Sequence, residues 1–254
     1  KYNRILGIST GILSFVVFAL TVEPTASYWD CAEYISTSAK LQIGHPPGAP
    51  LFQMLGAIFS IFALELNQIA YAVNMMSVLS SALTIVFLFW SISLIGKEIL
   101  DLTNSLKKDQ AIKVFGSSFL GSISFTFTDS FWFNAVEAEV YAMATLILAI
   151  LFWLGLKWVD DFQNQRADKW LVLISFVVGL SFGVHFMGLL AIPSIGLLYY
   201  FKKYKKFNIK SFLIANIISV SILLFIFKLL LPSTLSMFGN LEVFFVNDLG
   251  LPFN

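Results

Sequence analysis

Residues 23–50 read EPTASYWDCAEYISTSAKLQIGHPPGAP, and they hold most of the polar chemistry of an otherwise apolar chain. The first long apolar run lies directly before them, and most of the chain after them is compatible with lipid. The chain is 58% hydrophobic and 12% charged, whereas roughly a quarter of the residues of a soluble domain are charged. Its mean hydropathy is +0.83. The composition therefore predicts a membrane protein whose functional site lies just outside the first span.

The apolar runs predict about seven transmembrane helices, because a helix needs about 20 apolar residues to cross a bilayer core of about 30 Å. The predicted spans are residues 5–22, 69–95, 114–131, 140–156, two spans within 170–201 that meet near 185–188, and 212–231. Residues 51–64 are too few to span and follow three prolines. We expect them to form an interfacial helix in the first outer loop, and we expect residues 232–254 to form a loop.

The basic residues predict the orientation, because lysine and arginine concentrate in cytoplasmic loops. With the N-terminus inside, all of them except Lys40 and Lys228 fall at the inner side of these spans. A full span at residues 51–64 would instead place the later basic loops on alternating sides. We therefore expect one all-α polytopic membrane domain over residues 1–254, with its N-terminus in the cytoplasm and its acidic loops outside.

Small and hydroxyl residues predict close helix packing in this domain. Residues 116–128 read GSSFLGSISFTFT, and Gly179 and Gly183 form a Gly-x-x-x-Gly pattern. A net charge of +1 gives no indication of nucleic-acid binding. The single cysteine, Cys31, excludes an intrachain disulfide and a cysteine zinc cluster.

The first outer loop carries the main candidate residues. Asp30 and Glu33 are three residues apart, so their carboxylates share one face of a short helix. Between Trp29 and Tyr34, near the membrane boundary, they could serve in base catalysis or could simply be solvated acids. His45 lies in a Gly-His-Pro-Pro-Gly turn, where it could face a phosphate or an acceptor, or the turn could be only a hinge.

A second group of candidates lies on later outer segments. Glu137 and Glu139 could share a divalent cation with the first-loop acids through oxygen ligands, or could be hydrated acids near a helix N-terminus. His185 lies where two predicted spans meet. It is expected either to face a cavity or to bond a backbone carbonyl of the broken helix.

Two long patterns resemble a known family. Residues 24–34 (PTASYWDCAEY) with residues 41–50 (LQIGHPPGAP) form the first, and residues 129–141 (DSFWFNAVEAEVY) form the second. They resemble glycosyltransferase family 117, whose members are bacterial relatives of the transmembrane-protein-260 type protein O-mannosyltransferases and belong to the GT-C superfamily. The resemblance implies a GT-C-like module of about seven spans in a bacterial inner membrane, with the active site on the periplasmic face. It also implies that residues 1–254 are the N-terminal part of a longer chain.

The resemblance also implies roles for individual residues. Asp30 would be the base that deprotonates a hydroxyl acceptor, such as a protein serine or threonine, and Glu33 would support it or bind the sugar. The sugar would come from a polyprenyl-phosphate donor, and Glu137 or Glu139 would orient the donor or acceptor or hold a metal. His45 matches the histidine of a His-Pro-Pro turn. Tyr141 closes the second pattern, and with His185 it completes the expected substrate-binding residues.

Two other classes of function fit parts of the sequence. A transporter would place charges in the middle of broken helices, whereas this chain has few ionisable residues within its spans. A non-catalytic subunit of an envelope or secretion complex would also contain a bundle of apolar helices. Loss of transfer on changing Asp30 would favour the enzyme over both.

Overall fold

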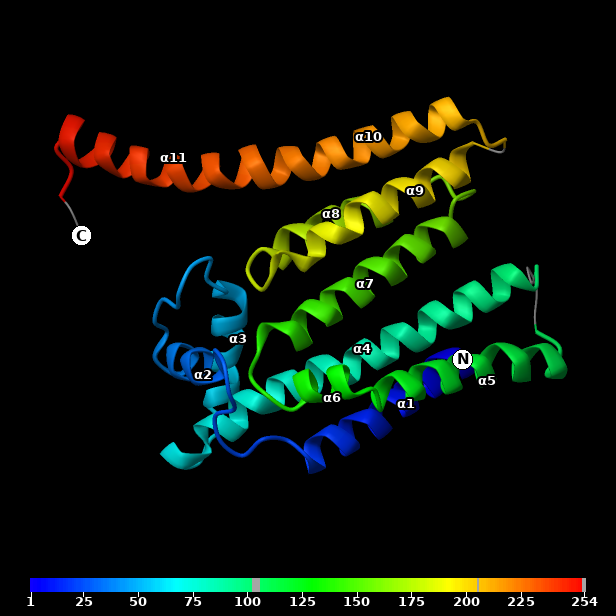
Figure 1. Ribbon diagram of the computed structural model, residues 1–254, viewed down its shortest axis with the longest axis horizontal. Helices are drawn as coiled ribbons and strands as arrows, with labels where there is room; N and C mark the ends of the chain where they lie inside the picture. The colour runs from blue at the N-terminus through cyan, green and yellow to red at the C-terminus, as the bar shows by residue number, and fades with distance from the viewer. Residues whose placement is uncertain (102–105, 205, 253–254) are drawn as a thin grey trace. The chain divides into compact units, whose positions relative to one another are not determined.

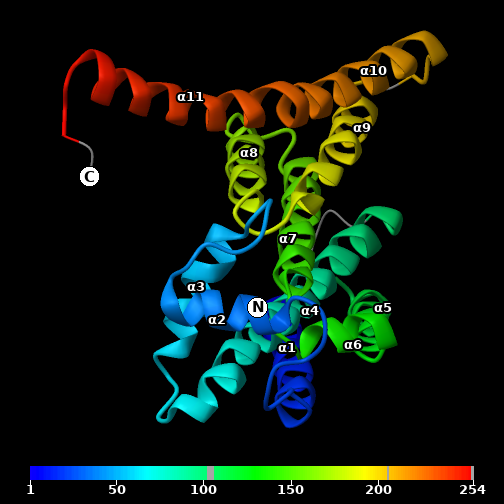
Figure 2. The same ribbon diagram turned by 60° about the vertical axis from the view of Figure 1, so that its left-hand side comes forward.

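Helices make up all the regular secondary structure of the computed structural model, which describes residues 1–101, 106–204 and 206–252 (Figures 1 and 2). The predicted all-α fold is confirmed. The described residues form two compact units, Lys1–Ala191 and Ile192–Asn254, and each is described by itself. The single domain expected over residues 1–254 stays a prediction.

The long helix α4 (Ile69–Ile99) is central in the first unit. It packs against α1 (Tyr2–Leu20), α5 (Lys108–Thr126) and α7 (Val140–Asp160), as Figure 1 shows. These elements fall at four of the predicted spans. The third predicted span was placed too late, because its helix begins at Lys108 and ends at Thr126. A separate short helix, α6 (Asp129–Ala135), follows it.

Small residues bring these helices together, as the sequence predicts. Ser118, Ser122 and Thr126 are fully buried on α5, and each hydroxyl donates to a backbone carbonyl one turn earlier in the same helix. Ser14 Oγ lies 2.8 Å from Thr126 Oγ1 across the contact between α1 and α5. Because each hydroxyl has a hydrogen-bond partner in its own helix, it can face another helix away from water.

The segment between α1 and α4 forms a small helical layer beside α4 (Figure 2). It contains α2 (Cys31–Lys40), α3 (Pro50–Ser60) and a short 3₁₀ segment, η1 (Leu66–Gln68). The expected helix at residues 51–64 is thus found, although it ends four residues earlier. Pro50 stands at its start, where proline needs no backbone partner for its nitrogen.

The helical run of residues 170–201 is broken, as predicted. α8 (Lys169–Ser181) is followed by a turn, by the 3₁₀ segment η2 (Phe186–Leu190) and by α9 (Ala191–Lys203). The two glycines of the Gly-x-x-x-Gly pattern do not pack together against one neighbouring helix, because α8 ends at Ser181 and Gly183 lies in the turn after it. A Cβ on Gly179 would meet nothing within 4 Å, whereas one on Gly183 would lie 2.6 Å from Leu51 Cβ.

In the second unit, the loop expected over residues 232–254 was wrong, because most of these residues are helical. The predicted last span continues as helix from Ile209 to Asp248 through α10 (Ile209–Phe225), a π-helical segment η3 (Ile226–Leu230), α11 (Leu231–Val243) and a second π-helical segment η4 (Phe244–Asp248). A loop was expected from Pro232, because proline removes a helical hydrogen bond. Here Pro232 lies in the first turn of α11, directly after the π-helical segment, where a change of hydrogen-bond register absorbs that loss.

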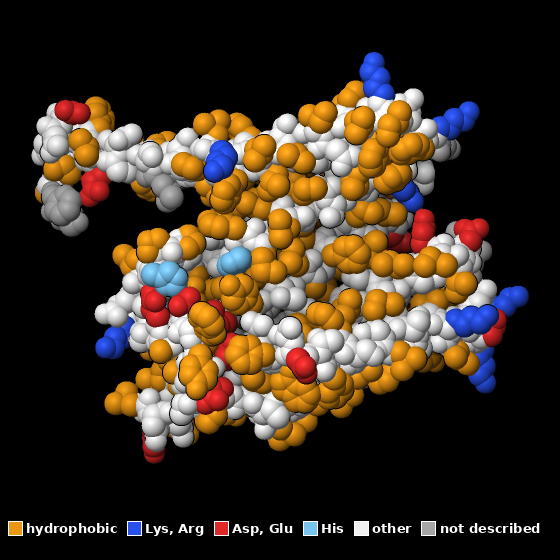
Figure 3. All heavy atoms as spheres, viewed as in Figure 1, with side chains coloured by type: hydrophobic (Ala, Val, Ile, Leu, Met, Phe, Trp, Pro, Cys, Tyr) orange, Lys and Arg blue, Asp and Glu red, His pale blue; other side chains and the backbone are white. Residues whose placement is uncertain are grey.

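Four helical stretches of the described chain are long and apolar enough to cross a membrane, namely Tyr2–Leu20, Leu66–Ile99, Val140–Asp160 and Ile209–Asp248. On the face shown in Figure 3, basic side chains gather at one end of the first unit's helices. Histidine and acidic side chains lie at the end that carries α2 and α3, and other acidic side chains lie beside the basic ones at the opposite end. The fold is that of an all-α polytopic membrane protein. The count of seven spans and the cytoplasmic N-terminus stay predictions.

Candidate active site

A cavity of about 130 Å³ in the first unit brings together four segments of the chain. The start of α2 contributes Asp30, the turn after α2 contributes His45, and the residues around the start of α7 contribute Glu139 and Tyr141. The break after α8 contributes His185. Of the seven residues expected from the sequence to form the site, the cavity therefore gathers five, while Glu33 and Glu137 lie outside its lining.

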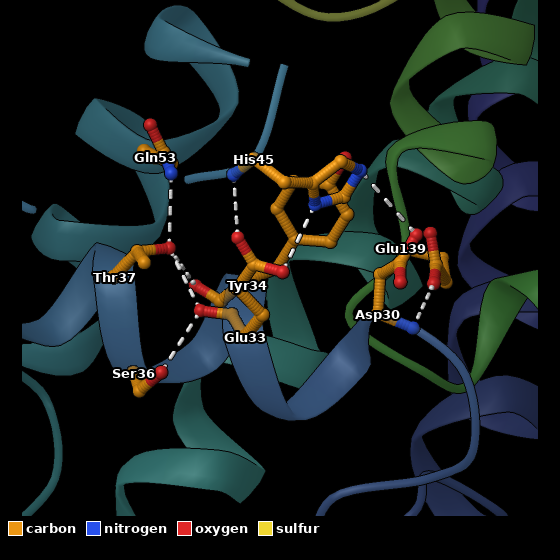
Figure 4. A network of polar contacts seen from close by, with 8 residues as sticks. All are labelled: Asp30, Glu33, Tyr34, Ser36, Thr37, His45, Gln53 and Glu139. Atoms are coloured by element: carbon orange, nitrogen blue, oxygen red, sulfur yellow. Dashed lines mark hydrogen bonds and ion pairs between the residues drawn. The ribbon is translucent and has the colours of Figure 1, made fainter. Parts of the chain in front are cut away.

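Glu33 nevertheless contacts the site through His45 (Figure 4). One carboxylate oxygen, Oε1, accepts the backbone N–H of His45 at 2.6 Å, and the other, Oε2, lies 2.9 Å from the ring atom Nδ1. The second ring nitrogen, Nε2, faces Asp30 Oδ2 at 3.8 Å. Asp30 and Glu33 share one face of α2, as their spacing predicts, and the imidazole lies between their carboxylates.

These contacts shift the pKa of both partners. The pKa of His45 is raised, mainly by its side-chain hydrogen bond to Glu33 and by the charge of that carboxylate, with smaller contributions from Asp30 and Glu139. The pKa of Glu33 is lowered, first by the backbone N–H of His45 and then by the ring. The pair therefore favours an imidazolium facing a carboxylate.

Gln53, which the sequence did not indicate, links α3 to α2 next to this turn. Gln53 on α3 donates from Nε2 to Thr37 Oγ1 at 2.9 Å, and Thr37 donates in turn to the backbone carbonyl of Glu33 at 2.7 Å (Figure 4). A Cβ on Gly44 would lie 2.9 Å from Gln53 Nε2 and 3.2 Å from Glu33 Oε1. A side chain at position 44 would therefore have to displace the ends of the Gln53 and Glu33 side chains.

Glu139 holds Asp30 from the opposite side. Its side chain is buried, and Oε1 accepts the backbone N–H of Asp30 at 3.2 Å. The preceding residue, Trp29, has φ +61° and an exposed side chain, a backbone conformation that L residues rarely adopt. Asp30 is thus presented to the cavity by a constrained peptide whose N–H is already bonded.

Glu137 is buried beneath the site rather than in it. Burial raises its pKa, and hydrogen bonds from Ser27 and Cys31 oppose the increase. Burial likewise raises the pKa of Glu139, and the nearby charge of Asp30 raises it further. Cys31 is fully buried beside both acids, and burial raises the pKa of its thiol. The two glutamates carry less negative charge than solvated acids would.

Replacing Glu139 by glutamine is expected to increase stability at neutral pH. A carboxyl whose pKa is raised on folding binds its proton more tightly in the folded state, so its charge lowers stability as pH rises from the ordinary value of 4.5 through the folded pKa. The amide retains an oxygen for the N–H of Asp30 and carries no charge.

Denaturant unfolding of both proteins from about pH 4 to about pH 8 measures this effect. The difference in unfolding free energy should be smallest at low pH and should widen as pH rises. The exposed Glu65→Gln variant is the control. A difference that does not change with pH would contradict the argument.

Tyr141 and His185 pack together on the far wall of the cavity, with their ring centroids 5.4 Å apart. His185 Nδ1 accepts the backbone N–H of Met187 at 3.2 Å. The neutral ring therefore carries its proton on Nε2. Of the two alternatives predicted for His185, the structure favours the cavity, and the ring accepts a backbone N–H rather than donating to a carbonyl.

Two backbone anchors tie the first loop to the bundle, and neither was predicted. The carbonyl of Gly183 accepts the N–H groups of Leu51 and Phe52 at 2.7 and 3.1 Å, at the start of α3. Asn74 on α4 donates to the carbonyls of Glu23 and Thr25 at 2.6 and 2.9 Å. In the sequence, these anchors were indicated only by an asparagine, Asn74, and a glycine, Gly183, within apolar runs.

Comparison with known proteins identifies the family. A family model described as the N-terminal domain of protein O-mannosyl-transferase TMEM260 matches residues 30–208, which is more than half of the chain. The chain belongs to the TMEM260 N-terminal domain family. The matched region begins at Asp30 and includes every residue expected to form the site.

Two curated relatives support this membership. Protein O-mannosyl-transferase tmem260 of Dictyostelium discoideum is 25% identical over 190 residues, which cover 70% of this chain and 21% of the relative. The mouse protein O-mannosyl-transferase TMEM260 is 25% identical over 168 residues, covering 65% of this chain and 21% of the relative. The aligned part of this chain thus corresponds to about a fifth of the length of either TMEM260 relative. No solved structure matches the chain.

Within the TMEM260 region, the groups best placed for a cation are Asp30, Glu33 and His45, whose nearest ligand atoms lie within 4.8 Å of one another. In this structure each oxygen of Glu33 contacts a nitrogen of His45. The expected sharing of a divalent cation between the two loops stays a prediction.

Proposed function

We propose that this TMEM260-family chain is the membrane part of a GT-C glycosyltransferase, of the family 117 type. It would transfer a sugar from a polyprenyl-phosphate donor to a hydroxyl acceptor, most simply a protein serine or threonine. The names of the two relatives support transfer of mannose to proteins. On the resemblance to the bacterial family, we place the protein in a bacterial inner membrane, with the N-terminus in the cytoplasm and the cavity on the periplasmic face.

The observation that carries the proposal is the cavity itself. It places an exposed carboxylate, Asp30, together with two histidines and a tyrosine at one end of a bundle of apolar helices. A donor with a lipid tail and a polar head requires this combination, because the tail stays in the bilayer while the head reaches the carboxylate. Both substrates can then be oriented at one point.

The proposed reaction needs one base and one leaving group. Asp30 accepts the proton of the acceptor hydroxyl, whose oxygen forms a bond to the anomeric carbon of the sugar. The bond between that carbon and the phosphate oxygen breaks, and the phosphate takes the electron pair. Glu139 positions Asp30 through its backbone, while Tyr141 and His185 form the opposite wall against which the sugar can lie.

A transfer assay with two donors tests the proposal. The full-length protein in lipid nanodiscs is given polyprenyl-phosphate mannose or the nucleotide sugar GDP-mannose, with a peptide that contains serine and threonine. We expect a product mass increased by one hexose with the lipid donor alone. The same peptide with alanine at those positions is the control. Transfer from GDP-mannose without lipid, or labelling of the alanine peptide, would contradict the proposal.

A further inference from the structure

The charge of the cavity poses a problem for an anionic ligand. Two carboxylates, Asp30 and Glu139, line it, and none of the lining residues is lysine or arginine. A lipid phosphate has at least one negative charge, which increases on the leaving oxygen as the sugar departs. Among the residues that the structure describes, His45 and His185 are the basic side chains of the lining, so an imidazole is the group that can supply the compensating positive charge.

The two histidines differ in how their ring nitrogens are used. His185 Nδ1 accepts the N–H of Met187, which leaves a neutral ring with a donor on Nε2, and burial lowers its pKa further. His45 Nδ1 instead lies against a carboxylate, so it carries a proton. His185 is therefore suited to donate a neutral hydrogen bond, and His45 is suited to carry charge.

Glu33 fixes the position of the His45 ring as well as its charge. It binds the backbone N–H and the ring Nδ1 of the same residue, one with each oxygen, so the imidazole cannot rotate without losing a bond. The groups that face this ring are Glu33 and Asp30 on the side of α2, Glu139 at the start of α7, and the phenol of Tyr34. All three carboxylates favour the protonated ring.

His45 also retains a donor for a ligand. Nε2 lies 3.8 Å from Asp30 Oδ2, which is beyond the length of a hydrogen bond. Its proton can therefore point to an anion in the cavity, as a charge-assisted donor of the kind that binds phosphate oxygens strongly.

We propose that Glu33 is a positioning residue that holds His45 as an imidazolium at the cavity, and that this imidazolium binds the phosphate group of a prenyl-phosphate lipid. The inference rests on the proposed function for its choice of ligand. It adds to that function that His45 supplies the positive charge for the phosphate and that Glu33 keeps His45 protonated.

Histidine NMR tests the first half, because the chain contains only two histidines. The chain is labelled with ¹³C-histidine in nanodiscs, and His185→Gln assigns the two signals. We expect His45 to titrate at higher pH than an ordinary histidine, and its pKa to fall in Glu33→Gln but not in Glu65→Gln. Circular dichroism verifies folding. Equal titration of His45 in the wild type and in folded Glu33→Gln would overturn the proposal.

Ligand titration in the same sample tests the second half. Farnesyl phosphate should shift the His45 signal, whereas farnesol, which lacks the phosphate, should not. Inorganic phosphate distinguishes a lipid head group from a free anion and should bind more weakly. In Glu33→Gln, farnesyl phosphate should bind about tenfold more weakly, as expected for a weakened hydrogen bond to a charged group. Equal shifts with farnesol, or binding only after magnesium is added, would overturn His45 as the phosphate-binding cation.

The farnesyl phosphate titration tests phosphate binding separately from the proposed glycosyltransferase activity, because no sugar is transferred in it. Sugar transfer without a farnesyl phosphate shift at His45 would overturn the inference and leave the glycosyltransferase standing. The expected shift without transfer from any polyprenyl-phosphate sugar would support the phosphate site and overturn the proposed reaction.

Discussion

Asparagine at position 30 is expected to lower the rate of sugar transfer by about 10²- to 10⁴-fold, the usual contribution of a general base. Asp30→Asn preserves the shape of the side chain and removes its ability to accept a proton. The Asp30 side chain is 52% exposed, and its ion pair with His45 is 3.8 Å long, so little stability depends on the charge. Initial rates with polyprenyl-phosphate mannose, together with thermal unfolding midpoints, measure both effects.

Asp129→Asn is the matched control, because Asp129 lies on α6 and is not among the residues that line the cavity. It should keep the wild-type rate. A wild-type rate in Asp30→Asn would exclude Asp30 as the base, and the nearest alternative would be Glu33. Glu33 would be a weaker base than an ordinary glutamate, because each of its oxygens already contacts a nitrogen of His45 and these contacts lower its pKa.

Local chemistry allowed much of this site to be predicted. The spacing of Asp30 and Glu33 determines that they share a face of any short helix, and the Pro-Pro turn determines that the chain must reverse near His45. The break near His185 follows from glycines in an apolar run. Each of these statements depends on neighbours within a few residues, and each was found in the structure.

The partners across the chain could not be predicted. The bond from Glu139 to the N–H of Asp30 joins residues 109 apart, and nothing in either segment specifies the other. Gln53 and Asn74 are single polar residues in apolar helices, and the sequence does not indicate which carbonyl or hydroxyl satisfies them. Pro232 was misleading for a related reason, since a π-helical segment upstream compensates for the hydrogen bond that proline removes.

Alanine at position 74 is expected to lower the free energy of unfolding by about 1–3 kcal/mol, the cost of leaving buried or partly buried polar groups without a partner. Asn74 is fully buried on α4, and its amide donates to two carbonyls, those of Glu23 and Thr25. Asn74→Ala removes both donors and leaves a void where the amide was. The connection between α1 and α2 would then lose its anchor to α4.

Denaturant unfolding in nanodiscs measures this loss, with Asn216→Ala as the matched control. Asn216 donates only to Phe212 O within its own helix, a carbonyl that can also accept a backbone N–H, so its removal should cost less than half as much. Because Asp30 lies only a short stretch of chain after Thr25, Asn74→Ala should also reduce transfer, while the direct contacts between His45 and Glu33 remain in place. Equal stability of the two alanine variants would mean that water or the backbone replaces the Asn74 amide, and that the first loop is held mainly by Gly183 and Glu139.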